Sequence, residues 1–409
     1  MTTKKKTHAT TSTYITYEHL DKIGETAVYY GFTPMKSPAI TKPDLDAAKD
    51  ILEGDYVDDE TERHGKLPLR AEEKIALMRM YQENDLQSLP QPVMIYFKDP
   101  CRGSLKKGNY HRYADLEILG SSGAIAEASL IQSARVMLNE LGYSSTAVEI
   151  NSIGDRDSIA RFARELTSYY RKNINTMTPE CRQLMKQDVF ELLASHVTGA
   201  HEINEKAPRS MDFLSETSKR HLEEVLEYLE ALAIPYTINN SLIGNRKYCT
   251  ETIFTIINTD SSDKKPKSRI LALGVRYNGL AKRLGLKRDI PGVGISLLCP
   301  DTDASLRKTV TKMRRPIASF VQLGLESKLV ALDVIERLRQ VKIPLHVSLA
   351  KDRLGAQVST VEKYHTPYTI VIGKKEAVER TAVVRKTETH AQEIIPLDLL
   401  AKHMKKLVG

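Results

Sequence analysis

The chain has 409 residues, of which 41% are hydrophobic and 27% are charged, and its 60 basic and 52 acidic residues give a net charge of +8. This composition is typical of globular proteins and excludes a wholly disordered chain, a collagen and a coiled coil, while the length predicts one to three domains. No apolar run approaches the roughly 18 residues that a membrane span requires, so we expect no membrane partner.

The N-terminus and the cysteines predict the compartment. The opening MTTKKKTHATTST lacks the hydrophobic stretch of a secretion signal and predicts a flexible arm over residues 1–13. The four cysteines are widely spaced and form no CxxC pair, so we expect neither a metal site nor a disulfide framework. Free cysteines favour a reducing compartment, and we therefore expect a cytoplasmic protein.

Apolar spacing predicts helices and strands along the first 232 residues. In chain order these are a helix at 18–30, a short strand near Met35, a helix at 72–81, strands at 93–97 and 114–119, a long helix, a short strand at 148–150, and a mostly helical stretch at 157–232. Gly120–Gly123 opens the long helix, where a serine-capped turn is favoured over an anion site.

The second half predicts two kinds of sheet. Strands at 236–239, 252–257, 270–275 and 294–298 are joined by loops, which predicts an antiparallel sheet. After Pro316, helices alternate with strands, which predicts a small α/β unit. We therefore expect an α+β body over residues 14–315, with a helical insertion at about 157–232, and an α/β domain over residues 318–409.

The positive charge is concentrated in the last quarter of the chain. Residues 307–409 contain 20 Lys or Arg and 10 Asp or Glu, a net charge of +10, which leaves −2 for residues 1–306. The segment 307–315 has five basic residues and no acidic one, and it is interpreted as an exposed linker. This asymmetry favours a polyanionic partner, and a solvated basic face is the alternative.

Motifs spread over the chain from about Tyr14 to the C-terminus resemble those of the histidyl-tRNA synthetase family. The stretches are YHRYADLEILG running on to EINSIGD (110–155), PECRQLMKQDVFELL (179–193), the segment 207–239, GVRYNGLAKRLG (274–285), PGVGISL (291–297) and YTIVIGKKEAVERTAVVRK (368–386). The resemblance implies a class II synthetase core, which is an antiparallel sheet flanked by helices, followed by an α/β anticodon-binding-like domain. It also implies a homodimer and a tRNA partner.

The family reaction joins histidine to ATP as an adenylate and then transfers histidine to tRNA. Its transition state is anionic at the α-phosphate, so positioned Arg side chains and Mg²⁺ are needed. ATP and Mg²⁺ are thus implied only if the activity is retained, and otherwise no cofactor is. The residues that match pocket positions are Arg70, Glu72, Arg102, Arg112, Asp115, Glu117, Tyr248, Arg276 and Tyr277.

Several pocket motifs depart from the family pattern. In place of "R-P-E-G-T" this chain has Arg70 to Lys74, which keeps the glutamate for the histidine amino group as Glu72 but has a lysine where a small hydroxyl residue is expected. The motif 2 "F-R-x-E" has no clean match, and Arg102 or Lys98 is the candidate substitute. Lysine is not equivalent to arginine where two bonds to a phosphate are needed.

The histidine loop and motif 3 also differ. The family's "R-G-L-D-Y-Y-T" is here Gly244-Asn-Arg-Lys-Tyr-Cys-Thr250, so its leading Arg is Gly244, its Asp is Lys247 and its second Tyr is Cys249. Motif 3 places Asp301 where the family has an Arg against the nucleotide. Loss of one oriented charge partner costs about 10²–10³ in rate, by analogy with oxyanion-hole donors.

Some single residues allow two interpretations. Arg276 and Tyr277 fit either the site or the core, and Glu117 is either an inward ligand or a solvated strand residue. Lys106 and Lys107 fit either the tRNA acceptor end or a solvated loop, and Lys312, Arg314 and Arg315 are further candidates for RNA contact. Cys249 is expected to be a small buried residue, and His111 and His365 are expected to be structural.

The leading hypothesis is a divergent histidyl-tRNA synthetase-like protein that is impaired in histidine adenylation and acts by binding tRNA or a protein partner. One alternative is an active histidine–tRNA ligase with divergent loops. The other is a histidine-sensing regulatory subunit resembling that of ATP phosphoribosyltransferase. Members of that kind usually lack the C-terminal domain, which this chain has.

Overall fold

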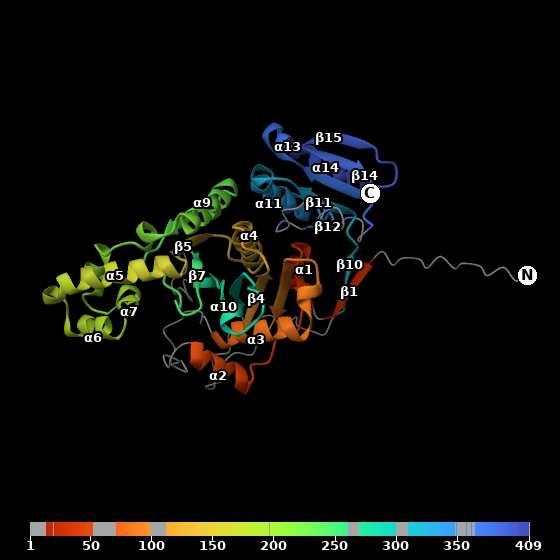
Figure 1. The fold of residues 1–409 in the computed structure, drawn as a ribbon. Coiled ribbons are helices and arrows are strands. Elements are labelled where there is room, and N and C mark those ends of the chain that lie inside the picture. The colour runs from red at the N-terminus through yellow and green to blue at the C-terminus, as the bar shows by residue number, and fades with distance from the viewer. Residues whose placement is uncertain are drawn as a thin grey trace, which may run out of the picture.

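The computed structural model describes residues 14–18, 20–51, 71–98, 112–195, 197–260, 270–299, 310–347 and 365–408, with the single positions 349, 357 and 361. The body is built on an eight-stranded sheet (Figure 1). Its strands, in spatial order, are β2 (Thr33–Pro34), β3 (Val93–Lys98), β4 (Arg112–Leu119), β9 (Gly292–Cys299), β8 (Ile270–Arg276), β7 (Thr250–Asn258), β5 (Thr146–Gly154) and β6 (Tyr236–Ile238).

The centre of this sheet is antiparallel, as predicted, and both of its edges are parallel. Every neighbouring pair from β3 to β5 is antiparallel, whereas β2 pairs with β3 and β6 with β5 in parallel. The β5–β6 pair is parallel because the helical insertion connects these strands, and parallel neighbours need such a crossover.

Alternation along the strands buries both faces of the sheet. Leu116 and Ile118 of β4 belong to the hydrophobic cluster that contains α4 (Ile125–Glu140), α1 (Lys22–Tyr29) and α9 (Glu216–Ala231). Ile95 and Phe97 of β3 belong to a second cluster with α3 (Ala71–Glu83) and α2 (Lys42–Ile51). The site described below lies on the α3 face, because Asp115 and Glu117 alternate with the apolar residues of β4.

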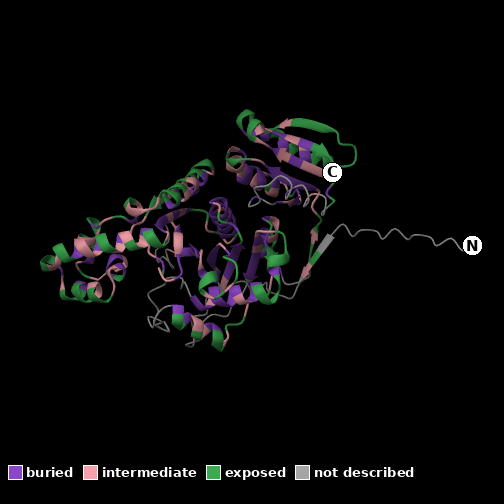
Figure 2. Cartoon of the chain, in the orientation of Figure 1, coloured by how far each residue is buried: buried purple, intermediate pink, exposed green. Residues whose placement is uncertain are grey.

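The helical insertion has a core of its own and extends away from the body (Figures 1 and 2). It contains α5 (Arg156–Lys172), α6 (Pro179–Gln187), α7 (Val189–Ala194) and α8 (Ala200–Glu205), with 3-10 turns at Ile174–Thr176 and Ser210–Phe213, and it ends in α9. Phe162 packs edge-on against Phe190 and stacks on Phe213. Asp155 caps α5 by accepting a hydrogen bond from the Ser158 amide.

The C-terminal part forms a separate five-stranded sheet. Its spatial order is β12 (Leu345–His346), β11 (Ala318–Gln322), β13 (Tyr368–Ile372), β14 (Thr381–Lys386) and β15 (Gln392–Pro396), with the helices α11 (Leu325–Gln340), α13 (Lys374–Glu379) and α14 (Leu397–Val408). The α/β pattern is confirmed here. The strand β11 was not predicted because all five of its residues are buried, and α13 was not predicted because six residues are too few for a clear helical period.

The basic segment before this sheet is not a linker. Val310–Arg314 forms β10, which pairs antiparallel with β1 (Tyr14–Glu18) as a separate two-stranded ribbon. The helix expected from residue 18 therefore begins only at Lys22, after its N-cap Asp21. Further elements that the sequence did not predict are α2, α10 (Leu280–Arg283) and the 3-10 turn Leu86–Ser88. None of the described helices combines the length and hydrophobicity needed for a membrane span.

Polar contacts join the body to the C-terminal sheet. The Tyr29 hydroxyl donates to the Ile343 carbonyl at 2.9 Å, and the Tyr30 hydroxyl donates to Glu336 Oε2 at 2.7 Å. Arg339 of α11 lies 3.4 Å from Glu140 at the end of α4. The hydrophobic cluster of α4 also continues into α11, so the two parts share one core.

Replacing Tyr30 by phenylalanine tests this junction. The ring of Tyr30 is buried and its hydroxyl bonds a carboxylate, so we expect a loss of about 1.5–3 kcal/mol in the free energy of unfolding. Denaturant unfolding measures this change, and Tyr143→Phe, at a half-buried position near the end of α4, is the control. Equal stability of Tyr30→Phe and the wild-type chain would show that this hydrogen bond does not stabilise the junction.

Candidate functional site

The site is centred on Glu117, in the middle of β4. This strand lies between β3 and β9, and Asp115 and Glu117 are both about 3% exposed. The Asp115 carboxylate accepts a hydrogen bond from the Ser296 hydroxyl of β9. An unpaired buried carboxylate is costly, so the partners of Glu117 decide what this site can do.

Among the described residues, Glu117 has two side-chain partners, Lys74 and Tyr277. The Lys74 ammonium of α3 forms an ion pair with Glu117 Oε1, and the Tyr277 hydroxyl donates to Glu117 Oε2 at 2.6 Å. Lys74 Nζ also lies 5.2 Å from the centroid of the Tyr277 ring, within range of a cation–π interaction. Burial and the charge of Glu117 raise the pKa of Tyr277 well above its ordinary value, so the phenol stays a donor.

Two glycines of β9 make room for this arrangement. Gly294 is paired directly with Glu117 across β4 and β9, and a Cβ at this position would collide with the Glu117 carboxylate. A Cβ at Gly292 would collide with the ring of Tyr277. The two glycines of the motif PGVGISL are therefore explained by local packing, because the side chains of Tyr277 and Glu117 lie against the backbone at these positions.

The histidine-loop match closes one side of the site with apolar packing. Tyr248 and Cys249 are both buried, and a Cβ at Gly244 would lie 3.0 Å from the Cys249 sulfur. Burial raises the pKa of the Cys249 thiol to about 12. The thiol is therefore protonated at neutral pH and is not an activated nucleophile, which agrees with the expectation of a small buried residue.

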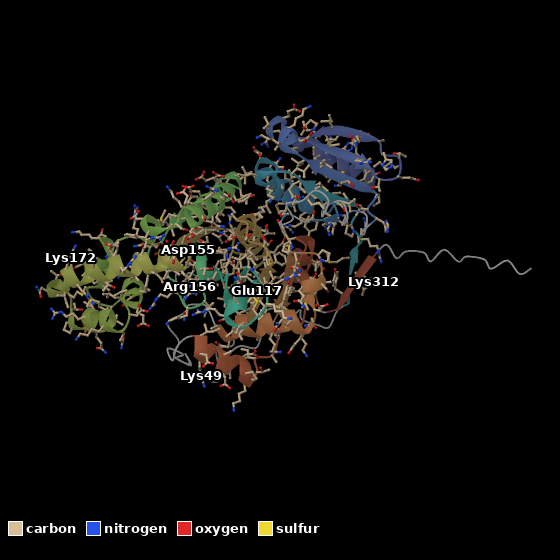
Figure 3. The ribbon with its side chains drawn as sticks, in the orientation of Figure 1. Lys49, Glu117, Asp155, Arg156, Lys172 and Lys312 are labelled. Atoms are coloured by element: carbon tan, nitrogen blue, oxygen red, sulfur yellow. The ribbon has the colours of Figure 1, made fainter. Side chains whose placement is uncertain are left out.

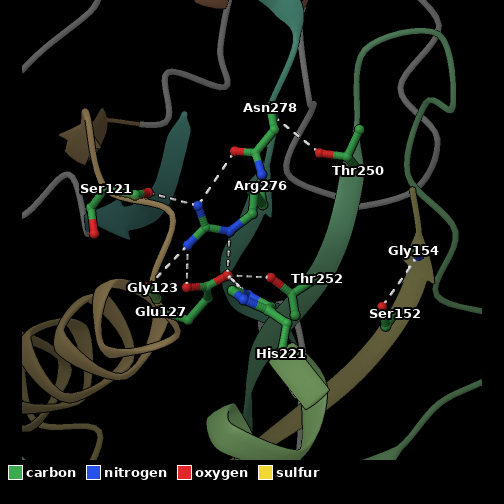
Figure 4. Close-up of polar contacts among 10 residues, drawn as sticks. All are labelled: Ser121, Gly123, Glu127, Ser152, Gly154, His221, Thr250, Thr252, Arg276 and Asn278. Atoms are coloured by element: carbon green, nitrogen blue, oxygen red, sulfur yellow. Dashed lines mark hydrogen bonds and ion pairs between the residues drawn. The ribbon is translucent and has the colours of Figure 1, made fainter. Parts of the chain in front are cut away.

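Arg276 belongs to a second buried cluster, which is centred on Glu127 (Figure 4). Its Nε lies 2.6 Å from Glu127 Oε1 of α4, and its guanidinium also donates to the Ser121 carbonyl at 2.9 Å. His221 of α9, at 2.8 Å, and Thr252 of β7, at 2.7 Å, contact the same carboxylate oxygen. Burial alone would raise the pKa of Glu127, but the charges of Arg276 and His221 outweigh it and hold this pKa below its ordinary value.

The remaining predicted residues are placed as follows. Glu72 is buried on α3, two residues before Lys74, while Lys312, Arg314 and Arg315 are exposed on β10 and just after it. Arg112 lies at the start of β4, and its side chain is not among those described. The residues outside the described part of the chain are Arg70, Arg102, Lys106, Lys107, His111 and Asp301. The structure thus brings Glu117 and Tyr277 together and places Arg276 elsewhere.

Magnesium does not fit the carboxylates of Asp115 and Glu117 as they stand. In the parts of the chain that the structure describes, no three Asp, Glu, His or Cys side chains gather in a way that could hold a metal ion. Glu117 is already held by an ammonium and a phenol, and Asp115 by a hydroxyl. Octahedral Mg²⁺ would have to displace these partners, so no step is assigned to the metal here.

The sequence reasoning missed three features of this molecule. It treated Lys74 only as the loss of the family's small hydroxyl residue, although a lysine can form an ion pair with a buried glutamate such as Glu117. It also missed the pairing of Glu127 with Arg276, because these residues are 149 positions apart and no local pattern links them. The third is a shallow hollow of about 580 Å³ along α5, which is lined by Ala163, Arg164, Thr167, Ser168, Arg171 and Lys172. Basic residues at helical spacing (164, 171) were the available signal.

This hollow is remote from Glu117. Figure 3 shows Lys172 at the outer end of the insertion, Glu117 in the middle of the body and Lys312 on the opposite side. The hollow is therefore a surface feature of the insertion rather than an opening into the site.

Comparisons with known proteins agree with the motifs. A family model described as "Anticodon binding domain" matches residues 321–407. The chain is 25% identical to the histidine–tRNA ligase of Symbiobacterium thermophilum, over 95% of this chain and 94% of that protein, and 27% identical to that of Fervidobacterium nodosum, over 91% and 90%. The fold matches apo histidyl-tRNA synthetase of S. aureus with a TM-score of 0.50 and 22% identity, covering 94% of each chain. Motifs, fold and relatives agree along nearly the whole length, and together they support the histidyl-tRNA synthetase family for this chain.

Proposed function

We propose that this chain is a histidyl-tRNA synthetase-like protein that binds tRNA and is impaired in histidine adenylation. The observation that carries the second half is the buried ion pair between Lys74 and Glu117. Adenylation requires free histidine in the pocket, and its cationic groups need unoccupied carboxylates. Here the β4 carboxylate is already neutralised by the chain itself.

Other positions support the same conclusion. In the histidine loop, this chain has Gly244 where the family has its leading Arg. It has the buried Cys249 where the family has its second Tyr. The guanidinium of Arg276 donates hydrogen bonds to Glu127 and to the Ser121 carbonyl before α4. These donors are therefore not available to a phosphate. Loss of several oriented cations at an anionic transition state lowers the rate by at least about 10².

Binding of tRNA is supported by the C-terminal domain and by two basic surfaces. The anticodon-binding match lies in the part of the chain with the net charge of +10. The first basic surface is the strand β10 with Arg315, and the second is the exposed face of α5 with Arg164, Arg171 and Lys172. Phosphate contacts supply much of the affinity for nucleic acids, and these residues provide separate charges for such contacts.

A triple variant on β10 tests this part of the proposal. We expect Lys312→Ala/Arg314→Ala/Arg315→Ala to weaken tRNA binding by roughly 10–100-fold and to reduce the slope of log K against log salt by about 2. Fluorescence anisotropy of labelled tRNA with the full-length chain, over a range of salt concentrations, measures both quantities. Lys42→Ala/Lys49→Ala removes two exposed lysines of α2 and is the control.

Three results would count against the proposal or favour an alternative. Binding of tRNA that is absent, or insensitive to salt, would exclude an RNA-binding role. Histidine-dependent ATP–pyrophosphate exchange at the rate of an active relative would instead establish a divergent histidine–tRNA ligase. Stabilisation of the wild-type chain by free histidine without exchange would favour the regulatory-subunit alternative.

A further inference from the structure

In the ion pair between Lys74 and Glu117, the Lys74 ammonium resembles a bound ligand and the Glu117 carboxylate resembles its binding site. The two side chains come from different elements, α3 and β4, and are 43 residues apart in the sequence. The Lys74 side chain is 8% exposed and that of Glu117 is 4% exposed, so solvent screens the pair little.

The surroundings of the ammonium are specific for a cation. The phenol of Tyr277 holds one oxygen of Glu117 and leaves the other for the ammonium. The ring of Tyr277 adds its electron-rich face, 5.2 Å from Nζ. A carboxylate, an aromatic face and a neutral phenol together form a site for an organic ammonium ion.

The ammonium is carried on a long, flexible side chain, so it can be removed without moving the helix. Lys74 reaches Glu117 through four methylene groups, and α3 itself is held by apolar packing of Ile75, Leu77 and Met78. Shortening residue 74 to alanine would therefore leave α3 in place. It would open a cavity the size of a small alkylamine, with an unpaired carboxylate at its end.

We propose that Lys74 is the resident ligand of the Glu117–Tyr277 site, which is selective for small primary ammonium ions and is closed to free amines and amino acids while Lys74 is present. This inference rests on the proposed function in one respect, namely that the pocket no longer serves adenylation. Its consequence is that the Lys74–Glu117 ion pair ties α3 to β4 without any bound substrate.

Rescue of Lys74→Ala by amines tests this inference. We expect Lys74→Ala to lower Tm by roughly 10 °C, because Glu117 is left buried and unpaired. Ethylamine or propylamine at about 100 mM is expected to restore half of that loss or more, whereas sodium chloride at equal ionic strength restores none. Free histidine is expected to stabilise Lys74→Ala and Lys74→Thr but to leave the wild-type Tm unchanged.

Two control variants separate charge from volume. Lys74→Met removes the ammonium but fills the cavity, so it is expected to be destabilised and not rescued by amines. Lys49→Ala removes an exposed lysine of α2 and is expected to have neither effect. Rescue of Lys74→Met to the same extent as Lys74→Ala, or no rescue of Lys74→Ala, would overturn the inference.

A measurement on the wild-type chain decides the matter if Lys74→Ala does not fold. Acetylation of the native protein by an N-hydroxysuccinimide ester, followed by peptide mass spectrometry, reports the accessibility of each lysine. We expect Lys74 to react at least tenfold more slowly than Lys49. Equal rates, or an increase in wild-type Tm with amines or histidine, would show that the site is open.

These readouts are independent of the tRNA part of the proposed function. If the inference fails while tRNA binding is normal, the RNA-binding role stands and only the account of the pocket is wrong. If tRNA binding fails while amines rescue Lys74→Ala, the pocket account stands and the RNA-binding role is wrong.

Discussion

Replacing Glu127 by glutamine is expected to lower the free energy of unfolding by about 3–5 kcal/mol, among the largest effects of any single substitution in the described chain. Glu127 and Arg276 are both 0% exposed, and among the described residues the Glu127 carboxylate is the one acidic group that contacts the guanidinium (Figure 4). Glutamine keeps the shape of the side chain and removes its charge, which leaves Arg276 buried without a counter-ion. Denaturant unfolding at pH 7 measures the loss.

The matched control is Glu127→Gln with Arg276→Met. Removing both charges eliminates the penalty of the unpaired guanidinium, so we expect the double variant to be more stable than Glu127→Gln alone. His221→Gln, which keeps a hydrogen-bonding group near the same oxygen, is expected to cost much less. A double variant that is as unstable as the sum of its single changes would show that Glu127 and Arg276 act independently.

The same pair predicts how stability depends on pH. The pKa of Glu127 is below its ordinary value of 4.5 in the folded chain, because Arg276 and His221 stabilise the carboxylate against the cost of burial. Its contribution to stability is therefore complete above about pH 4.5 and is lost as the pH falls through and below that value. Unfolding curves from pH 7 to pH 3 should fall less steeply for Glu127→Gln than for the wild-type chain.

The second large effect concerns Lys74→Met, for which we expect a loss of about 3–5 kcal/mol at pH 7. Methionine retains the apolar volume of the lysine stem, so the loss reports the uncompensated Glu117 rather than a cavity. Glu117→Gln removes the other charge and is expected to cost a similar amount, since Lys74 is then buried without its partner.

A double-mutant cycle isolates the interaction. The variant with both Lys74→Met and Glu117→Gln has no buried charge at this site, so we expect it to recover at least 1 kcal/mol relative to the more damaged single variant. Urea unfolding of the four proteins gives the coupling energy. A coupling energy near zero would mean that the two side chains do not form the ion pair that the structure shows.

The sequence predicted the fold well where a regular pattern of hydrophobic residues extends over many positions. The helix α4 and the central antiparallel strands have clear apolar patterns, and the quoted motifs at 110–155, 274–285 and 291–297 include α4 and parts of these strands. The segment Val310–Arg314 was misread because its strand is stabilised by pairing with β1, almost 300 residues earlier. Charge alone gave no sign of that partner, since a basic strand and a basic linker have the same composition.

The site was predictable only in part. Glu117 and Tyr277 were named as candidates, and the structure places them in hydrogen-bond contact. Lys74 was recognised as a departure, but its ion pair depends on how α3 packs across β4, which no local pattern encodes. Arg276 was matched by its motif, yet its side chain turns toward Glu127 because the buried carboxylate on α4 offers two oxygens to its guanidinium.

The packing around the site and the charge that occupies it can be considered separately in this chain. Gly292 and Gly294 keep the close approach of Tyr277 and Glu117 to the sheet. The same two side chains now hold Lys74. Under the proposed function, a scaffold with these contacts presents the C-terminal domain and the α5 face to RNA.

Histidine-dependent ATP–pyrophosphate exchange tests the central claim most directly. The full-length chain and the histidine–tRNA ligase of Symbiobacterium thermophilum would be assayed side by side, with saturating histidine, ATP and Mg²⁺. We predict an exchange rate at least about 100-fold lower for this chain, because Lys74 already occupies the Glu117 carboxylate of the site. A histidine-dependent rate within about tenfold of the relative's, a difference of 1.4 kcal/mol in the barrier, would contradict the account.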